Sequence, residues 1–239
     1  EQFTAANYNP EKWAKLFKKT GARYAVLTTK HHDGVALWDT KLSKLNVKEK
    51  TPAKRDLVAP FVEALRQENI KVGLYYSLCD WSHPDYNVVF PRPNTQNDYP
   101  QKGQNELSKW QRFVRFYQGQ LKELSDNFKP DLYWFDGDWE KSSEQWQAQS
   151  LKDSLLSWNP KVIVNSRLKT YGDYSTPEQG IPIDTPQGPW EFCMTMNDNW
   201  GYYPSDTNYK PISQIIRTFV EVIASGGNWL LNIGPKPDG

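Results

Sequence analysis

The sequence contains few of the features that mark disulfide-rich, membrane-spanning or nucleic-acid-binding proteins. It has only two cysteines, Cys79 and Cys193, among 239 residues. Two cysteines cannot build a disulfide framework, so we expect two free, buried thiols. No apolar run approaches the roughly 18 residues that cross a bilayer. The net charge of +1 gives no basic surface for nucleic acid or anionic lipid. We therefore predict neither a nucleic-acid partner nor a membrane partner.

Aromatic residues, in contrast, are abundant. They make up 14% of the chain, which includes 11 tryptophans. Aromatic faces stack on sugar rings, but they also fill protein cores. The composition therefore leaves both a carbohydrate partner and a tryptophan-rich core open.

Short apolar runs alternate with helical patterns along the whole chain. The runs suited to buried strands are 23–29, 71–77, 131–135, 161–166 and 228–234. The helical patterns are 10–20, 54–69, 104–127, 143–158 and 211–225. Strand and helix in alternation predict βαβ units and a parallel sheet, that is, an α/β fold. Because no linker or low-complexity tract interrupts the pattern, we expect one domain over residues 1–239.

Polar and aromatic residues gather directly after the predicted strands. The segments are "KHHDG" (30–34), "LCDWSHP" (78–84), "DGDWE" (136–140) and Arg167 with "YGDYSTPEQG" (171–180). In an α/β barrel, chemistry collects at the carboxyl ends of the strands. The starts of the strands carry no comparable residues, so the pattern indicates an active-site face.

The adjacent histidines His31 and His32 are the first candidates for a metal site. Neighbouring residues of an extended segment point to opposite sides, which makes the pair a poor chelate. The only other histidine is His83, and the cysteines lack zinc spacing. We favour histidines that donate hydrogen bonds to a polar ligand, with a core hydrogen bond and a metal site as the alternatives.

The stretch "DLYWFDGDWEK" (131–141) ends an apolar run on a carboxylate. Asp136 stands between Trp134 and Trp139, and Gly137 separates it from Asp138. An Asp-Gly pair is typical of a turn. A turn, however, needs no flanking aromatic residues, so these residues alone leave a turn and a catalytic carboxylate both possible.

Six segments together resemble one enzyme family. They are "YAVLTTKHHDGVALWDTKLS" (24–43), "GLYYSLCDWSHPDY" (73–86), "LYWFDG" (132–137), "NSR" (165–167), "PWEFCMTMNDNWGY" (189–202) and "GGNWLLNIGPKPDG" (226–239). In this order they are similar to the α-L-fucosidases of glycoside hydrolase family 29, over essentially the whole chain. The resemblance implies a (β/α)8-like, TIM-type barrel that removes terminal α-L-fucose with retention, through a covalent fucosyl-enzyme intermediate. It also implies no metal and no organic cofactor, and a secreted, periplasmic or lysosomal enzyme.

The chain departs from the family pattern at its two ends. Family members begin with a strand of the type "FGIFIHWG", which carries a fucose-binding histidine, whereas this chain starts after it. The end at Gly239 precedes the last helix of the usual barrel. We therefore expect an incomplete barrel that lacks the first strand. The alternative functions are an inactive partial fucosidase that binds carbohydrate, a lectin-like module and a metal-dependent barrel hydrolase.

The resemblance assigns the two carboxylates that retaining hydrolysis needs. Asp136 matches the family nucleophile. Glu178, in "GDYSTPEQG", lies close to where several bacterial members carry the acid/base, and Glu191 in "PWEFC" is its rival. Asp138 matches no family position, so we interpret it as a turn residue.

The remaining candidates would contact the sugar. Arg167 matches a family position and could bind a hydroxyl through its planar donor fork, with a barrel salt bridge as the alternative. Tyr75 and Trp38 fit pocket walls or the core. The full set of expected substrate-binding residues is His31, His32, Trp38, Tyr75, Trp134 and Arg167.

Overall fold

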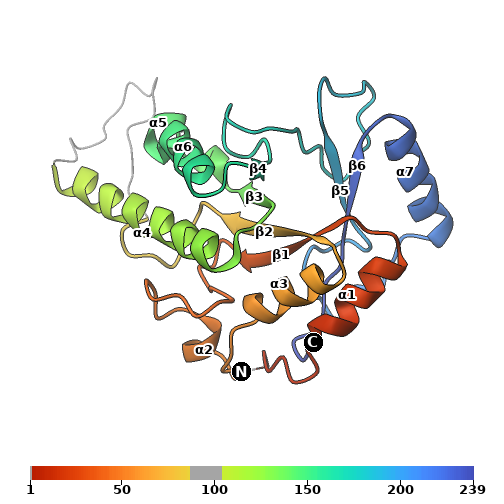
Figure 1. The fold of residues 1–239 in the computed structure, drawn as a ribbon, viewed down its shortest axis with the longest axis horizontal. Helices are drawn as coiled ribbons and strands as arrows, with labels where there is room; N and C mark the ends of the chain where they lie inside the picture. The colour runs from red at the N-terminus through yellow and green to blue at the C-terminus, as the bar shows by residue number, and fades with distance from the viewer. Residues whose placement is uncertain (1, 87–103) are drawn as a thin grey trace.

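The computed structural model describes residues 2–86 and 104–239. Figure 1 shows strands in the middle of the molecule and helices around them. The strands are β1 (Tyr24–Lys30), β2 (Lys71–Ser77), β3 (Leu132–Asp136), β4 (Ile163–Val164), β5 (Glu191–Thr195) and β6 (Asn228–Asn232). The helices are α1 (Pro10–Lys19), α2 (Val47–Lys50), α3 (Val58–Gln67), α4 (Gln104–Phe128), α5 (Ser143–Trp146), α6 (Ala148–Trp158) and α7 (Ile212–Ala224), with a 3₁₀ turn η1 (Asp138–Glu140).

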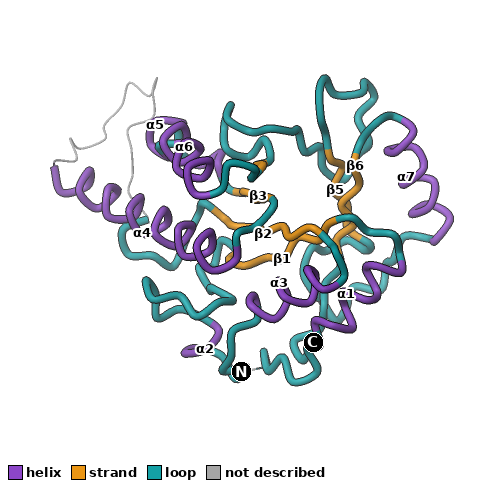
Figure 2. Tube along the Cα trace, in the orientation of Figure 1, coloured by secondary structure: helices purple, strands orange, loops and turns teal. Residues whose placement is uncertain are grey.

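All strand pairs run parallel, as the alternation of strand and helix predicts. One sheet has the order β1-β2-β3-β4 and the other pairs β5 with β6. Residues 174–178 lie between the two sheets, because Tyr174 bridges to Asn165 and Glu178 bridges to Cys193. Within the described residues no pairing joins β1 to β6, so the strands form an open arc, with helices along its outside (Figure 2).

Alternation along the strands separates an inner face from an outer one. The inner cluster draws Leu132 and Trp134 from β3, Cys193 from β5, and partly buried Tyr24, Val26, Tyr75 and Leu230 from β1, β2 and β6. The intervening residues Leu74, Tyr76, Tyr133 and Phe135 face the helices and join the main core. Because Asp136 follows Trp134 by two residues, it shares the inner side of β3.

The ends of the helices follow local chemistry. In α1, the Asn9 side chain accepts a hydrogen bond from the Lys12 N–H, and Pro10 occupies the first turn, where its missing N–H costs nothing. In α3, Asp56 accepts from the backbone N–H groups of Val58 and Ala59. The predicted helix over 54–69 therefore begins later, at Val58, with Pro60 in its first turn.

Other elements differ more from the sequence-based prediction. The strand predicted over 161–166 pairs only at Ile163–Val164, because the Asn165 side chain binds both the N–H and the C=O of Phe135. The helix predicted over 143–158 is divided at Gln147, whose φ is 50°. The fully buried strand β5 was not predicted, although its five residues "EFCMT" form a short, largely apolar run.

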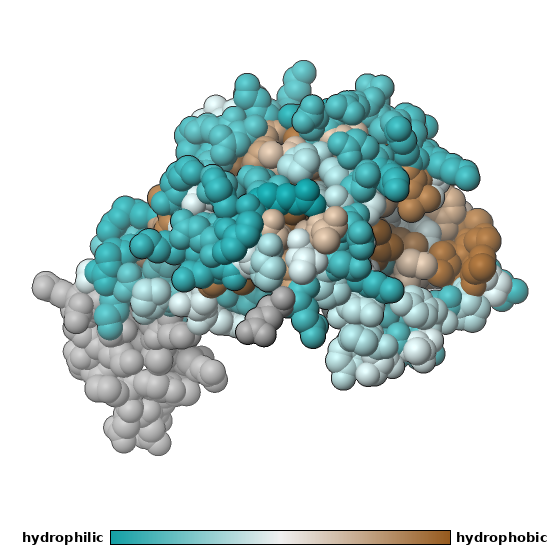
Figure 3. Space-filling view, turned by 90° about the horizontal axis from the view of Figure 1, so that it is seen from below, coloured by the Kyte–Doolittle hydropathy of each residue, from teal (hydrophilic) through white to brown (hydrophobic). Residues whose placement is uncertain are grey.

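Helix α7 carries an exposed apolar face. Its exposed residues are Ile212, Ile216, Phe219, Val220 and Ile223. Figure 3 shows a hydrophobic area at the end of the molecule where α7 lies. In the part of the chain that is described, no helix combines the length and the apolar character needed to cross a membrane.

Candidate active site

Asp136 ends strand β3 and is the centre of a polar cluster inside the arc. The residue is 8% exposed, and its side chain accepts hydrogen bonds from two donors. Tyr75 Oη lies 2.7 Å from Oδ2, and Arg167 Nη1 lies 2.8 Å from Oδ1. The following Gly137 has φ +80°, a conformation that favours glycine, and this ends the strand directly after the carboxylate. The Asp-Gly pair thus forms a turn, and it also places at the end of β3 a nearly buried carboxylate that accepts two hydrogen bonds.

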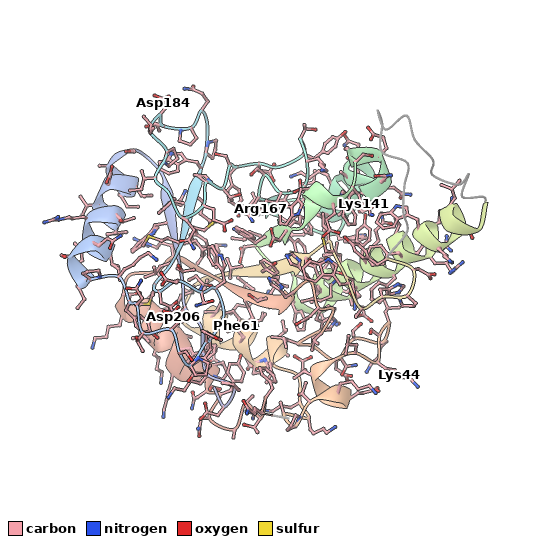
Figure 4. The ribbon with its side chains drawn as sticks, turned by 180° about the vertical axis from the view of Figure 1, so that it is seen from behind. Lys44, Phe61, Lys141, Arg167, Asp184 and Asp206 are labelled. Carbon is pink, nitrogen blue, oxygen red and sulfur yellow. The ribbon has the colours of Figure 1, made fainter. Side chains whose placement is uncertain are left out.

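Arg167 joins this carboxylate to a second one. Its Nη2 lies 2.5 Å from Glu178 Oε2, while Nη1 binds Asp136. Figure 4 shows Arg167 in the middle of the molecule, near the strands. Glu178 is held in place because its residue pairs with Cys193 of β5 and because the Gln179 N–H donates to the Cys193 carbonyl. The side chain of Glu178 is 37% exposed, against 11% for Asp136, so the two carboxylates differ in access to solvent.

Trp134 forms the wall behind these donors. The Arg167 guanidinium lies over its ring, with Cζ 4.4 Å from the centroid, and Tyr75 stacks against it at 5.6 Å. Burial alone would lower the pKa of Arg167, but hydrogen bonds to Glu178 and Asp136 outweigh burial and raise the pKa. Burial and the nearby Asp136 raise the pKa of Tyr75. Both residues therefore keep the protons that they donate.

His32 is fixed by a chain of hydrogen bonds. Its Nδ1 lies 2.5 Å from Ser77 Oγ, and that hydroxyl donates its proton to the Cys79 carbonyl at 3.0 Å. Nδ1 must therefore carry the hydrogen, which leaves Nε2 as an acceptor 3.7 Å from Asp136 Oδ2. Burial, with a smaller contribution from His31, lowers the pKa of His32. The neutral ring can accept a hydrogen bond from a sugar hydroxyl at Nε2, so the prediction that this histidine donates to the ligand is corrected.

The prediction that the neighbouring histidines point to opposite sides is wrong. The rings of His31 and His32 lie 4.2 Å apart, and His31 stacks on Tyr75. The reason is that β1 ends at Lys30, so the two residues lie in a turn rather than on an extended strand.

This geometry creates one possible cation site. A ligand atom from each of His31, His32 and Asp136 lies within 4.8 Å of the others. The carboxylate already accepts from Tyr75 and from the positively charged Arg167. A nearby guanidinium repels a cation, so this donor set fits a hydroxyl-rich neutral ligand better than a metal ion. The absence of a metal stays a prediction.

Glu191 is buried away from solvent. It is 2% exposed, and its carboxylate accepts from Trp134 Nε1 at 2.8 Å and from the Tyr24 hydroxyl. Burial raises its pKa, while the bonds from Tyr24 and Trp134 act in the opposite direction. Because both of its oxygens are occupied within the protein, Glu191 is less suited than Glu178 to reach a leaving group.

Trp38 and Asp138 both have structural roles. Trp38 is 1% exposed, belongs to the main core, and donates its indole N–H to Glu123 Oε2 at 3.1 Å. The pocket-wall prediction for Trp38 is therefore corrected: its side chain packs on the helix side of the sheet. Asp138 accepts from the Lys169 N–H at 2.9 Å, which agrees with its interpretation as a turn residue.

Two exposed tryptophans beside the site were not among the predicted site residues. The rings of Trp81 and Trp139 lie 4.9 and 6.1 Å from that of His32, and their exposed fractions are 55% and 60%. Both follow predicted strand ends, which was the signal available. Ser77, which sets the His32 tautomer, gave no signal because it resembles any small residue of a buried strand.

Comparisons with known proteins identify one family over the whole chain. The family model described as "Alpha-L-fucosidase" matches residues 1–239. The tissue alpha-L-fucosidase of Mus musculus is 37% identical over 252 residues, which cover 100% of this chain and 52% of that protein.

Solved structures of α-L-fucosidases have the same fold as this chain. Alpha-L-fucosidase isoenzyme 1 from Paenibacillus thiaminolyticus superposes with a TM-score of 0.87 at 38% identity, covering 99% of this chain and 60% of that one. A family 29 α-L-fucosidase from Bacteroides thetaiotaomicron, trapped as a covalent intermediate with 2-fluoro-fucosyl fluoride, gives 0.86 at 32% identity, covering 100% and 58%. The likeness confirms the barrel-type α/β fold class. The chain spans about half the length of the curated relatives that it matches.

Proposed function

Because the chain belongs to the α-L-fucosidase family, we propose that it is a glycoside hydrolase that removes terminal α-L-fucose from glycans with retention of configuration. The observation that carries the proposal is the sharing of one guanidinium by two carboxylates, Asp136 and Glu178. Retaining enzymes hold their carboxyl groups about 5–5.5 Å apart, whereas inverting enzymes leave room for a water between them. Two carboxylates on neighbouring nitrogens of Arg167 favour the closer arrangement.

In the first step, Asp136 acts as the nucleophile. A carboxylate oxygen attacks the anomeric carbon of fucose and forms a covalent ester, while the bond from that carbon to the leaving oxygen breaks. Protonated Glu178 gives its proton to this oxygen, so the glycan departs as a neutral alcohol. The ion pair between Glu178 and Arg167 must open for this role, and the 37% exposure of the Glu178 side chain leaves it room to move.

In the second step, water replaces the departed glycan. Glu178, now ionised, accepts a proton from the water, whose oxygen attacks the anomeric carbon. The ester to Asp136 breaks and the carboxylate is restored. Two inversions at one carbon give net retention, so the first product is the α anomer of L-fucose.

The other side chains bind and orient the sugar. Tyr75 and Arg167 hold Asp136 through one hydrogen bond to each oxygen, which fixes the direction of its attack. His31 and the Nε2 atom of His32 face hydroxyl groups of the sugar. Trp134 supplies an apolar wall on which a sugar face can pack.

The proposed substrates are fucosylated oligosaccharides and glycoconjugates. The Bacteroides relative trapped with 2-fluoro-fucosyl fluoride supports both the sugar and the covalent step. The named relatives include tissue and plasma fucosidases, and we expect a secreted, periplasmic or lysosomal protein. We treat residues 1–239 as one catalytic barrel unit.

The test is the hydrolysis of p-nitrophenyl α-L-fucoside, followed by proton NMR of the sugar in the first minutes. We expect nitrophenol release and the α anomer of fucose before mutarotation. The β anomer as first product would contradict the retaining mechanism. Binding of L-fucose without any turnover would instead support the alternative of a carbohydrate-binding fragment.

A further inference from the structure

The mechanism proposed above makes no use of Glu191, although this residue is an acid buried inside the arc. It opens strand β5 and is 2% exposed. Burying a carboxyl group is unfavourable unless partners compensate for the lost water. A neutral residue such as leucine would fill the same space without this cost, so the acid has to do something that leucine cannot.

The contacts of Glu191 indicate what that is. One oxygen accepts from Trp134 Nε1 at 2.8 Å, and the other accepts from the Tyr24 hydroxyl. The titratable groups that face it are Tyr24 from β1, Tyr174, Cys193 and the charged Arg167. The described contacts of the carboxylate therefore join β5 to β1 and to β3 across the interior.

Trp134 passes this restraint to the catalytic carboxylate. Tyr75 on β2 stacks against the Trp134 indole, and Arg167, which follows β4, lies over the same ring. These two residues are the donors that hold Asp136. A rotation of the indole would leave both donors without their packing surface.

We propose that Glu191 is a positioning residue: its carboxylate fixes the Trp134 indole, which in turn sets Tyr75 and Arg167 against Asp136. The inference rests on the proposed function of Asp136. Glu191 does not touch the reacting atoms and transfers no proton. It acts only through hydrogen bonds, so a side chain that accepts the same indole N–H can replace it.

Kinetics of two variants test this. Glu191→Gln keeps an oxygen that accepts from the indole N–H, and its amide N–H can donate to the Tyr24 hydroxyl oxygen. We expect the kcat of this variant to stay within about threefold of the wild type. Glu191→Ala frees the indole, and a misplacement of about 1 Å can cost 10²-fold in rate. We expect that loss in kcat on both aryl fucosides and natural oligosaccharides, with an unchanged alkaline limb of the pH profile.

Glu123 offers a matched control. It also accepts an indole N–H, that of Trp38, together with the Thr40 hydroxyl at 2.6 Å, but it lies in the main core. Glu123→Ala should lower the midpoint of thermal unfolding and leave kcat unchanged. Equal losses of kcat in Glu123→Ala and Glu191→Ala would show a general folding effect and overturn the proposal. A Glu191→Gln variant as slow as Glu191→Ala, or a lost alkaline limb, would also overturn it.

A spectroscopic readout does not depend on turnover. The indole ¹⁵N–¹H signal of Trp134, assigned as the one that Trp134→Phe removes, should move in Glu191→Ala and stay close to its place in Glu191→Gln. L-Fucose should bind about tenfold more weakly to Glu191→Ala than to the wild type. If the chemical shift of the Trp134 indole signal stays the same in both variants, the proposal is overturned. A wild-type chain without hydrolysis would remove the proposed function and leave this test intact.

Discussion

Replacing Arg167 by lysine isolates the link between the two carboxylates. The guanidinium binds Asp136 with one nitrogen and Glu178 with another, at 2.8 and 2.5 Å. A lysine ammonium keeps the positive charge but is a single point, so it cannot reproduce both bonds of a planar fork. The variant therefore removes the geometry and retains the charge.

The size of the effect follows from the lost bond. A hydrogen bond to a charged group contributes about 1.5–3 kcal/mol, and about 1.4 kcal/mol corresponds to a factor of ten. Loss of one of the two bonds predicts a fall in kcat/KM of about 10- to 150-fold. The loss of the planar contact with Trp134 adds to it.

The assay is the hydrolysis of p-nitrophenyl α-L-fucoside at several pH values. Arg112→Lys is the matched control, because Arg112 also makes two charged hydrogen bonds, although both go to the carboxylate of Asp85, at 3.0 and 2.8 Å. We expect no change in kcat/KM for this control. An Arg167→Lys variant within threefold of the wild type would refute the role of the shared guanidinium.

Three further predictions concern neighbouring groups. Glu178→Ala should lose most activity, about 10²–10⁴-fold, on natural oligosaccharides and least on activated aryl fucosides. The alkaline limb of its pH–rate profile should disappear as well. If Glu191→Ala shows this pattern instead, Glu191 is the acid/base and Glu178 is not. Gly137→Ala should lower thermal stability and activity far more than Gly21→Ala. Both glycines have positive φ, but only at Gly137 would the new Cβ lie 2.4 Å from Cys79 Sγ. Equal effects of the two substitutions would contradict this steric clash. Because burial raises the pKa of Glu191 above 4.5, its contribution to stability is fully present below that pH and is lost as pH rises through the folded value. The stability of the wild type relative to Glu191→Gln should therefore decline as the pH rises above 4.5 in urea unfolding, and a constant difference would contradict the raised pKa.

Much of the fold could be predicted because the pattern of apolar runs is a local property. The strands β1, β2, β3 and β6 each combine an apolar run with a following turn or polar segment. Strand β5 was missed because its first residue is a glutamate, whose burial depends on Trp134 and Tyr24 from distant parts of the chain. A local pattern contains no information on such partners.

The site shows the same division. Asp136, Tyr75 and Trp134 share one side of neighbouring strands, and the period of two along a strand already predicts this. The pairing of Arg167 with Glu178 depends on how residues 174–178 join the sheet, and the fate of Trp38 depends on Glu123 in α4. Both are tertiary contacts that residue type alone leaves open.

Chemical rescue of Asp136→Gly tests the central claim most directly. The substitution removes the nucleophile and leaves space for a small anion where the carboxylate met Tyr75 and Arg167. We predict that the variant does not hydrolyse p-nitrophenyl α-L-fucoside, and that added azide restores nitrophenol release with β-L-fucosyl azide, the inverted product. Near-normal turnover without azide would contradict the assignment of Asp136 as the nucleophile.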